Sequence, residues 1–320
     1  MQAQALLPVF GQIGQPLALG RPDPDAAPSR RKAGVEYFPL QVRSILNRSR
    51  AARLPFDWTI NPYRGCEFGC TYCYARYTHN FFDLTGWKSF ESKIFFKQNA
   101  ASALRGELKR RSLKGQRIAI GTVTDPYQPA ERHFEITRAL LEVFTHVEGL
   151  DLAITTKSPL ILRDLDLLTD LDKKHTVSVN ITLTTVDPVL ARRTELRAPT
   201  PGARLRAIEG LAQEGIATQV FCMPIMPEIN SSEESLWPLL TRARDYGALD
   251  VIASPLFLKR DAKARFMPWL QKEFPDLVPL YRRLFGNRNY LEPLYSERLL
   301  ERFRRLRLRA GFPHTRPGRA

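Results

Sequence analysis

The chain has 320 residues, 43% of them hydrophobic, which is enough to bury the core of one large domain or two smaller ones. Its four cysteines are too few for a fold held together by disulfides, and no apolar run approaches the length that crosses a bilayer. We therefore expect a cytoplasmic protein without a membrane segment. The net charge of +15 favours polyanionic partners, nucleic acid first, but charge alone does not identify a partner.

Three regions follow one another along the chain. Residues 1–49 begin with a stretch rich in proline, alanine, glycine and arginine, and we expect a flexible arm here and not a signal peptide. Residues 50–260 alternate between β-type and helix-type runs and form the expected core domain. Residues 261–320 are expected to form a helical, arginine-rich extension of that core.

Six short runs in the core are predicted to be buried parallel strands, several of them dense in Val, Ile and Thr. They lie at residues 56–63, 117–125, 151–158, 176–185, 217–227 and 250–259. Helix-type runs alternate with them at residues 97–112, 132–147, 159–171, 201–214 and 232–246. This order predicts an α/β fold with six β/α units, in which chemistry lies at the carboxyl ends of the strands.

The last predicted helix, residues 296–312, is amphipathic. Leu299, Phe303 and Leu306 follow one face, and arginines follow another. The arginine face suits a phosphate backbone, but it equally suits a solvated surface on a helix that closes the domain. The sequence leaves both interpretations open.

Three of the four cysteines, Cys66, Cys70 and Cys73, follow the first strand with the spacing C-x-x-x-C-x-x-C. Clustered thiolates bind zinc or iron–sulfur clusters. A zinc site would need a fourth ligand, for which His79 is the candidate. A four-iron cluster with three cysteines keeps one iron open for chemistry, and this explains the number of thiols better.

The segment "NPYRGCEFGCTYCYAR" (61–76) resembles the signature of the radical S-adenosylmethionine (SAM) superfamily. The resemblance implies a partial (β/α)6 barrel of the TIM type and a [4Fe-4S] cluster held by Cys66, Cys70 and Cys73. It further implies that the open iron binds the amino and carboxylate groups of SAM. Reductive cleavage of SAM would then give a 5′-deoxyadenosyl radical that abstracts hydrogen from a substrate.

Three further segments narrow the resemblance to one branch of that superfamily. "GTVTDPYQPAE" (121–131), "TTKSPLILRDLDLL" (155–168) and "MPIMPEIN" (223–230) resemble the branch that includes spore photoproduct lyase and relatives labelled DNA repair photolyase. The resemblance covers residues 50–260. It implies a lyase-like enzyme that needs a reductant such as a flavodoxin or a ferredoxin, with nucleic acid as one candidate substrate.

The resemblance also implies five residues that contact SAM. Tyr72 would approach the adenine through its backbone, Thr124 and Asp125 the amino group, and Lys157 the carboxylate; Thr182 replaces a serine that relatives carry near the cofactor. Simpler interpretations stay open beside these. Asp125 also suits a turn before a proline, and Lys157 suits an ordinary surface position.

Other polar residues in these segments receive no chemical role. Glu131 is a weaker candidate that suits a helix cap as well, and a salt bridge explains Glu195 and Arg197 equally well. Cys222 lies in an apolar run and is expected to be an inert core residue. Tyr127 is a conceivable hydrogen donor without support from the sequence.

The branch's spore enzyme carries a thiol hydrogen donor just before the position of Asp125, and "GTVTD" has none. The sequence therefore leaves the substrate and the hydrogen donor open, and it predicts no oligomeric state. Two non-enzymatic alternatives also remain. One is a nucleic-acid-binding protein with a Cys3His zinc site or an iron–sulfur cluster, and the other is a cluster protein for electron transfer only.

Overall fold

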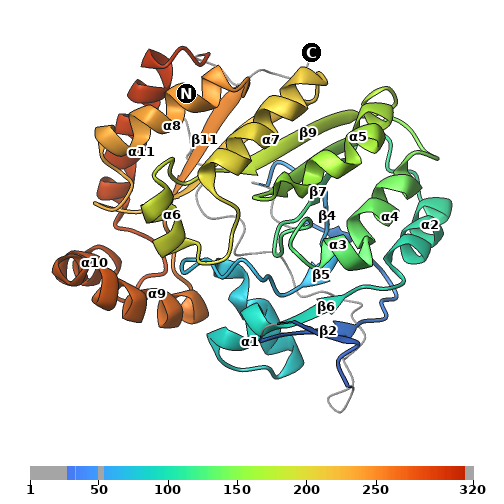
Figure 1. Ribbon diagram of the computed structural model, residues 1–320, viewed down its shortest axis with the longest axis horizontal. Helices are drawn as coiled ribbons and strands as arrows, with labels where there is room; N and C mark the ends of the chain where they lie inside the picture. Colours follow the sequence, from blue (N-terminus) through green and yellow to red (C-terminus); the bar gives the residue numbers. More distant parts are fainter. Residues whose placement is uncertain (1–26, 33, 50–53, 314–320) are drawn as a thin grey trace.

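The computed structural model describes residues 27–32, 34–49 and 54–313. Its main sheet has seven strands in the order β11-β10-β9-β8-β7-β4-β3, and it curves into an open barrel (Figure 1). The strands are β3 (Asn47–Arg48), β4 (Trp58–Ile60), β7 (Arg117–Ile120), β8 (Asp151–Thr156), β9 (Thr176–Thr182), β10 (Ala217–Ile225) and β11 (Asp250–Pro255). All neighbours pair in parallel except β3 and β4. The six predicted strands and the partial barrel are thus confirmed.

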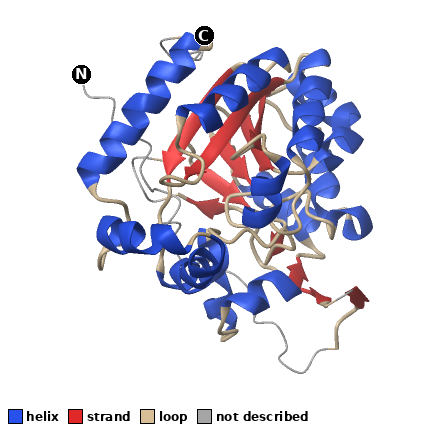
Figure 2. Cartoon of the chain, turned by 60° about the vertical axis from the view of Figure 1, so that its left-hand side comes forward, coloured by secondary structure: helices blue, strands red, loops and turns tan. Residues whose placement is uncertain are grey.

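Helices cover the outer face of this sheet, so that the red strands of Figure 2 are flanked by blue helices. Between and after the strands the chain forms α2 (Ala100–Arg110), α3 (Glu131–Phe134), α4 (Ile136–Phe144), α5 (Leu165–Asp172), α6 (Pro188–Thr194), α7 (Pro201–Gln213) and α8 (Glu233–Asp245), of which α5, α7 and α8 contact the strands directly. The run predicted as one helix at 132–147 is divided, because Glu135 adopts a left-handed backbone with φ 48° between α3 and α4. The run at 159–171 begins as a 3-10 helix, Pro159–Asp164, before α5.

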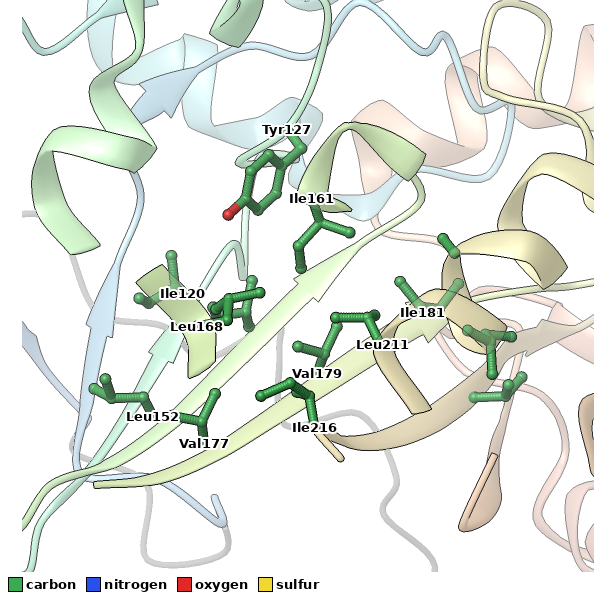
Figure 3. Close-up of a cluster of buried hydrophobic side chains, with 14 of the residues drawn as sticks. Ile120, Tyr127, Leu152, Ile161, Leu168, Val177, Val179, Ile181, Leu211 and Ile216 are labelled. Carbon is green, nitrogen blue, oxygen red and sulfur yellow. The ribbon is translucent and has the colours of Figure 1, made fainter. Parts of the chain in front are cut away.

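Strand β9 shows how the sequence separates the core from the barrel interior. Its alternating apolar side chains, Val177, Val179 and Ile181, are buried against Leu211 and Ile216 under the helices (Figure 3). Successive side chains of a strand point to opposite faces, so the polar residues between them face the interior. Each fully buried aliphatic side chain of this kind contributes about 1.5–3 kcal/mol.

A second, four-stranded sheet lies beside the barrel, and the sequence analysis did not predict it. Its order is β1-β2-β6-β5, with β1 (Arg30–Lys32), β2 (Val35–Pro39), β6 (Lys93–Phe96) and β5 (Tyr63–Arg64). The 3-10 helix η2 (Tyr74–Phe82) and helix α1 (Trp87–Ser92) precede β6. Of the segment expected to be a flexible arm, residues 1–26 lie outside the described residues, whereas β1, β2 and β3 belong to its remainder.

The C-terminal region is helical as predicted, with α9 (Arg260–Glu273), α10 (Val278–Phe285) and α11 (Pro293–Arg309). Leu299, Phe303 and Leu306 of α11 are buried. Arg307 is buried as well and bonds Asp250 of β11 through Nε at 2.7 Å. This arginine therefore fastens α11 to the sheet. Within the described part of the chain, no helix has the length and apolar character needed to cross a membrane.

Candidate active site

A cavity opens where the strands of the main sheet end. It measures about 1020 Å³, mouth included, and its wall comes from the residues that follow or end β7, β8, β9, β10 and β11. Every residue that the sequence analysis singled out for the cluster or for SAM lines it. These residues are Cys66, Cys70, Tyr72, Cys73, Thr124, Asp125, Lys157 and Thr182. The barrel thus brings together eight residues from positions 66 to 182.

The cysteine loop, residues 66–73, is fixed by contacts on its inner and outer sides. Gly65 enters the loop with φ 85°, and a Cβ there would stand 2.8 Å from the carbonyl oxygen of Lys93, so the close approach requires glycine. The Gly65 carbonyl accepts hydrogen bonds from Thr124 Oγ1 at 2.7 Å and from Gln128 Nε2 at 3.1 Å. Thr124 therefore positions the loop as well as lining the cavity.

Two arginines hold the outer side of the cysteine loop. Arg76 Nη2 donates to the Cys70 carbonyl at 2.6 Å, and Arg197 Nε donates to the Glu67 carbonyl at 2.7 Å. The buried carboxylate of Glu91 pairs with both guanidinium groups, at 2.8 and 2.7 Å. These contacts fix the backbone of the loop whose cysteine side chains line the cavity.

None of the three cysteines takes part in a disulfide. Burial raises the pKa of the Cys70 thiol to about 12, and it also raises the pKa values of Cys66 and Cys73. Over the described residues, no three His, Cys, Asp or Glu side chains come together in the arrangement that would hold a single metal ion. The three thiols therefore line the same cavity, close enough to influence one another's pKa values.

His79 does not join the cysteines. It is fully buried between Phe90 and Phe95, with ring centroids 5.2 and 5.8 Å away, and its Nε2 lies 3.0 Å from the Lys93 carbonyl oxygen. Burial lowers the pKa of His79 to about 4, so the ring is neutral near pH 7. The Cys3His zinc site considered above is therefore not formed.

Asp125 connects the ends of β7 and β8. Its Oδ1 accepts hydrogen bonds from Thr156 Oγ1 at 2.6 Å and from Tyr127 N at 2.9 Å, and its Oδ2 accepts one from Lys157 N at 2.8 Å. Burial raises its pKa, and the bond from Thr156 opposes this shift. The turn interpretation is thus correct, and the carboxylate also lines the cavity.

Lys157 presents a cation to the same cavity. Its Nζ lies 5.9 Å from the centroid of the Tyr72 ring, and among the described residues no hydrogen bond or ion pair holds it. Burial acts to lower its pKa, but the Glu195 carboxylate and the other groups around it oppose burial, and the net shift is upward. The side chain is therefore charged at neutral pH, and it can receive an anionic group inside the cavity.

A buried ion pair supports the wall behind Tyr72. The Tyr72 hydroxyl donates to Glu195 Oε1, and Arg204 Nη2 donates to Glu195 Oε2. Arg204 also donates to the Thr182 carbonyl at 3.1 Å, so one guanidinium holds two cavity-lining segments. Glu195 and Arg197 are both in salt bridges, as the simpler interpretation of the sequence held.

The remaining sequence candidates lie outside the cavity. Cys222 is fully buried in the core, as expected. Tyr127 points into the core near Ile161 and does not line the cavity (Figure 3), so the structure gives it no access to a substrate there. Glu131 is fully buried and accepts hydrogen bonds from the Tyr63 hydroxyl and from Arg163.

Aromatic residues to which the sequence motifs gave no role also line the cavity or lie beside it. Tyr74 and Phe257 line it and pack with ring centroids 5.1 Å apart, and Tyr290 packs against Phe257 at 5.9 Å. Tyr74 follows Cys73 directly, so the cysteine motif could have indicated that it lies near the cavity. Phe257 and Tyr290 come from the region after β11, and no local pattern marks them.

Known proteins resemble this chain in both sequence and fold. The model of the Radical SAM superfamily matches residues 60–236, more than half of the 320 residues. An uncharacterised protein of Mycobacterium tuberculosis is 37% identical over 84% of this chain and 79% of that protein. For one of Methanocaldococcus jannaschii the identity is 27%, over 82% of this chain and 93% of the relative.

Among solved structures, a spore photoproduct lyase variant with bound AdoMet and dinucleoside spore photoproduct superimposes with a TM-score of 0.63. The two chains are 15% identical in sequence, and the superposition covers 84% of this chain and 77% of the lyase chain. At this identity the likeness shows a common fold. The chain belongs to the radical SAM superfamily, and it is an enzyme whose cofactors are S-adenosylmethionine and a [4Fe-4S] cluster.

Proposed function

We propose that Cys66, Cys70 and Cys73 each bind one iron of the [4Fe-4S] cluster and leave the fourth iron open for the amino and carboxylate groups of SAM. When bound, the two cofactors supply a 5′-deoxyadenosyl radical for hydrogen abstraction. A single zinc ion would draw its thiolates to about 2.3 Å from one centre. A four-iron cluster would take each thiolate on a different iron, and the three thiols that line this cavity would leave one iron without a protein ligand.

The free ammonium of Lys157 is the observation that carries this proposal furthest. Lys157 lines the cavity, and among the described residues no hydrogen bond or ion pair holds its Nζ, so it can bind the SAM carboxylate. Asp125 faces the amino group, because Oδ2 accepts only one hydrogen bond and retains a lone pair. Thr124 lines the cavity beside it, Tyr72 approaches the adenine through its backbone, and Thr182 lies on the β9 side.

We further propose that the substrate is nucleic acid. Tyr74 and Phe257 line the cavity, and Lys259 Nζ lies 4.7 Å from the ring of Tyr77. Aromatic faces stack on bases, and neighbouring cations bind phosphates. The net charge of +15 supports this choice, as does the dinucleoside bound to the structurally similar lyase.

We propose that no thiol of this protein returns a hydrogen atom to the substrate radical. Among the described residues that line the cavity, no cysteine stands apart from the three proposed ligands, and Cys222 is enclosed in the core. The reaction is therefore a hydrogen abstraction whose later steps do not use a spare cysteine of the cavity. A low-potential carrier such as a flavodoxin or a ferredoxin supplies the electron.

The test is anaerobic purification followed by iron and sulfide analysis. We expect about four irons per chain, and 5′-deoxyadenosine after addition of SAM and dithionite. The triple variant Cys66→Ala, Cys70→Ala, Cys73→Ala should lose both. Cys222→Ala is the matched control and should keep both, because that thiol is in the core. Normal 5′-deoxyadenosine formation by the triple variant would contradict the proposal.

The substrate proposal needs a separate measurement. Fluorescence anisotropy with a labelled single-stranded oligonucleotide should show binding that weakens by about 5- to 150-fold in Phe257→Ala, since stacking on one aromatic contributes about 1–3 kcal/mol. The control Trp237→Ala changes an aromatic residue that does not line the cavity. Equal weakening in both variants would argue against base stacking on Phe257.

A further inference from the structure

A groove lies between α6 and α9, outside the cavity. Its walls include Val189, Arg192, Leu196, Arg265, Trp269 and Lys272. The two helices are held together at its base, where Trp269 Nε1 donates to the Arg193 carbonyl at 2.9 Å and Arg193 Nε pairs with Glu273 at 2.8 Å. The groove is therefore a fixed feature of the surface, on the side of the molecule away from α2 (Figure 1).

The groove combines an apolar centre with a positive rim. Val189 is 66% exposed, the highest value among the large hydrophobic residues of the described chain that are exposed. Arg192 and Lys272 are exposed beside it, and Arg265 lies over the ring of Trp87 at 4.1 Å. Two acids lie nearby: Glu273 pairs with Arg193 at 2.8 Å and with Lys272 at 3.8 Å, and Glu91 pairs with Arg197 at 2.7 Å and with Arg265 at 3.7 Å. Exposed Asp187 at the start of α6 accepts a backbone hydrogen bond, and the cations outnumber the acids around the groove. Apolar centres with charged rims are typical of protein–protein interfaces.

The groove also lies against the outer side of the cysteine loop. The carbonyl of Thr194, the last residue of α6, accepts a hydrogen bond at 2.9 Å from the amide of Thr71, the residue after Cys70. Glu195 then forms a β-bridge with Cys70 itself. One hydrogen bond and a few covalent bonds thus separate the end of α6 from Cys70. No residue lines both the groove and the cavity, so occupants of the two do not compete.

We infer that this groove docks an acidic one-electron carrier protein, which reduces the cluster from the outer side of the cysteine loop. The inference rests on the proposed function, in which Cys70 binds the cluster. One electron leaves the carrier, which is oxidised, and enters the cluster, and no atom is transferred. Electron tunnelling weakens steeply with distance, so a donor has to approach this loop, and the cavity side is reserved for SAM and substrate.

The charge and the apolar centre of the groove favour an acidic protein over a second copy of this chain and over nucleic acid. A second copy of this chain would bring positive rim against positive rim, which is repulsive in a symmetric contact. Nucleic acid would use the cations but not the exposed Val189 and the apolar wall beside it. An acidic protein uses both, and complementary charge speeds its encounter even where the interface is small.

The experiment compares two electron sources on the reconstituted full-length enzyme. 5′-Deoxyadenosine formation is measured with dithionite and, separately, with a titration of reduced, acidic flavodoxin. We expect Arg192→Glu/Lys272→Glu to raise the KM for flavodoxin at least tenfold at low salt and to leave the dithionite rate within twofold. Val189→Asp should act in the same direction. The control Lys109→Glu/Arg110→Glu carries the same charge change at exposed positions of α2 and should change neither rate.

A binding titration of flavodoxin to the same proteins makes the result independent of catalysis. Binding of flavodoxin by wild type that is no tighter than binding by the groove variant would overturn the inference. So would an equal loss of rate with both electron sources, because that indicates damage to the fold. Displacement of flavodoxin by an oligonucleotide would identify the groove as a nucleic-acid site, and a groove-dependent dimer in sedimentation would identify a self-interface; either overturns it. If wild type forms no 5′-deoxyadenosine with dithionite, the proposed function fails, whereas the binding titration still decides the docking site.

Discussion

The hydroxyl of Tyr72 donates a hydrogen bond to the carboxylate of Glu195, which lies 123 residues later in the chain. The same carboxylate pairs with Arg204, and both charged side chains are almost completely buried. The aromatic residue between Cys70 and Cys73 is therefore fixed by a pair that makes no contact with solvent. Its orientation depends on the integrity of that pair.

Replacement of Arg204 by methionine should destabilise the protein strongly. The change leaves the Glu195 carboxylate buried without its partner, and breaking such a pair costs about 3–5 kcal/mol. The free energy of unfolding from urea titrations measures this. Arg206→Met, at an exposed position of the same helix, should change it by less than about 0.5 kcal/mol. The double variant Glu195→Gln/Arg204→Met should recover part of the loss; no recovery would show that the buried charge is not the cause.

Gly69→Ala should disturb the cysteine loop more than an equivalent change elsewhere. Gly69 has φ 66°, and a Cβ there would lie 2.9 Å from Arg197 Nη2 and 3.0 Å from Glu91 Oε2. Gly215 has φ 74° with no atom within 4 Å, so Gly215→Ala meets only the backbone penalty of about 1–2 kcal/mol. We expect iron content after reconstitution to fall in Gly69→Ala and to stay normal in Gly215→Ala. Equal iron content in the two variants would contradict the support assigned to Arg197 and Glu91.

Lys157→Met should weaken SAM binding to the reconstituted enzyme by about 10- to 100-fold, since a hydrogen bond to a charged group contributes about 1.5–3 kcal/mol. Lys157→Arg should retain part of the affinity because it keeps the positive charge. Iron content should not change, and Lys173→Met, at a position 68% exposed, should bind SAM normally. Normal SAM affinity in Lys157→Met would exclude the assigned contact with the carboxylate.

His79 should make the protein sensitive to mild acid. Its pKa is about 4 in the fold and about 6.5 in an unfolded chain, so below pH 6.5 the unfolded chain takes up a proton that the folded chain does not. The stability contributed by the neutral ring is complete above pH 6.5 and is lost as the pH falls towards 4. The loss amounts to about 3 kcal/mol at pH 4.

Urea titrations of wild type and His79→Phe between pH 7 and pH 4 test this. The phenylalanine fits between Phe90 and Phe95 but loses the contact with the Lys93 carbonyl, so the variant should be less stable at pH 7. Its stability should then fall less with decreasing pH. Parallel curves for the two proteins would show that other groups govern the acid response.

Much of the core and of the site was predictable because both depend on short-range patterns. The strand at 176–182 is recognisable from Val177, Val179 and Ile181, which alternate with polar residues and become buried. Once the strand order is known, Asp125 and Lys157 fall at neighbouring carboxyl ends, and the cavity unites them. The chemistry of three clustered cysteines needs no tertiary information.

What escaped prediction depends on contacts between distant segments. Strand β2 pairs with β6, so that Tyr37 lies opposite Ile94, and neither short segment shows a strong pattern of its own. Strands this short are specified by their neighbours more than by their residues. The residue that pairs with Glu195 could not be predicted for the same reason. The sequence offers many arginines, and only the fold selects Arg204.

The second sheet has a practical consequence for work with shortened versions of this protein. The hydroxyl of Tyr37 in β2 donates to the Glu67 side chain at 2.9 Å, and Glu67 also accepts from the Ala130 amide at 2.8 Å. A recombinant fragment that begins at the expected core boundary, residue 50, would lack Tyr37 and therefore lose its hydrogen bond to Glu67, the second residue of the cysteine loop. Expression clones meant for crystallisation should therefore keep the chain from Arg30 onwards, so that the strands before residue 50 are retained.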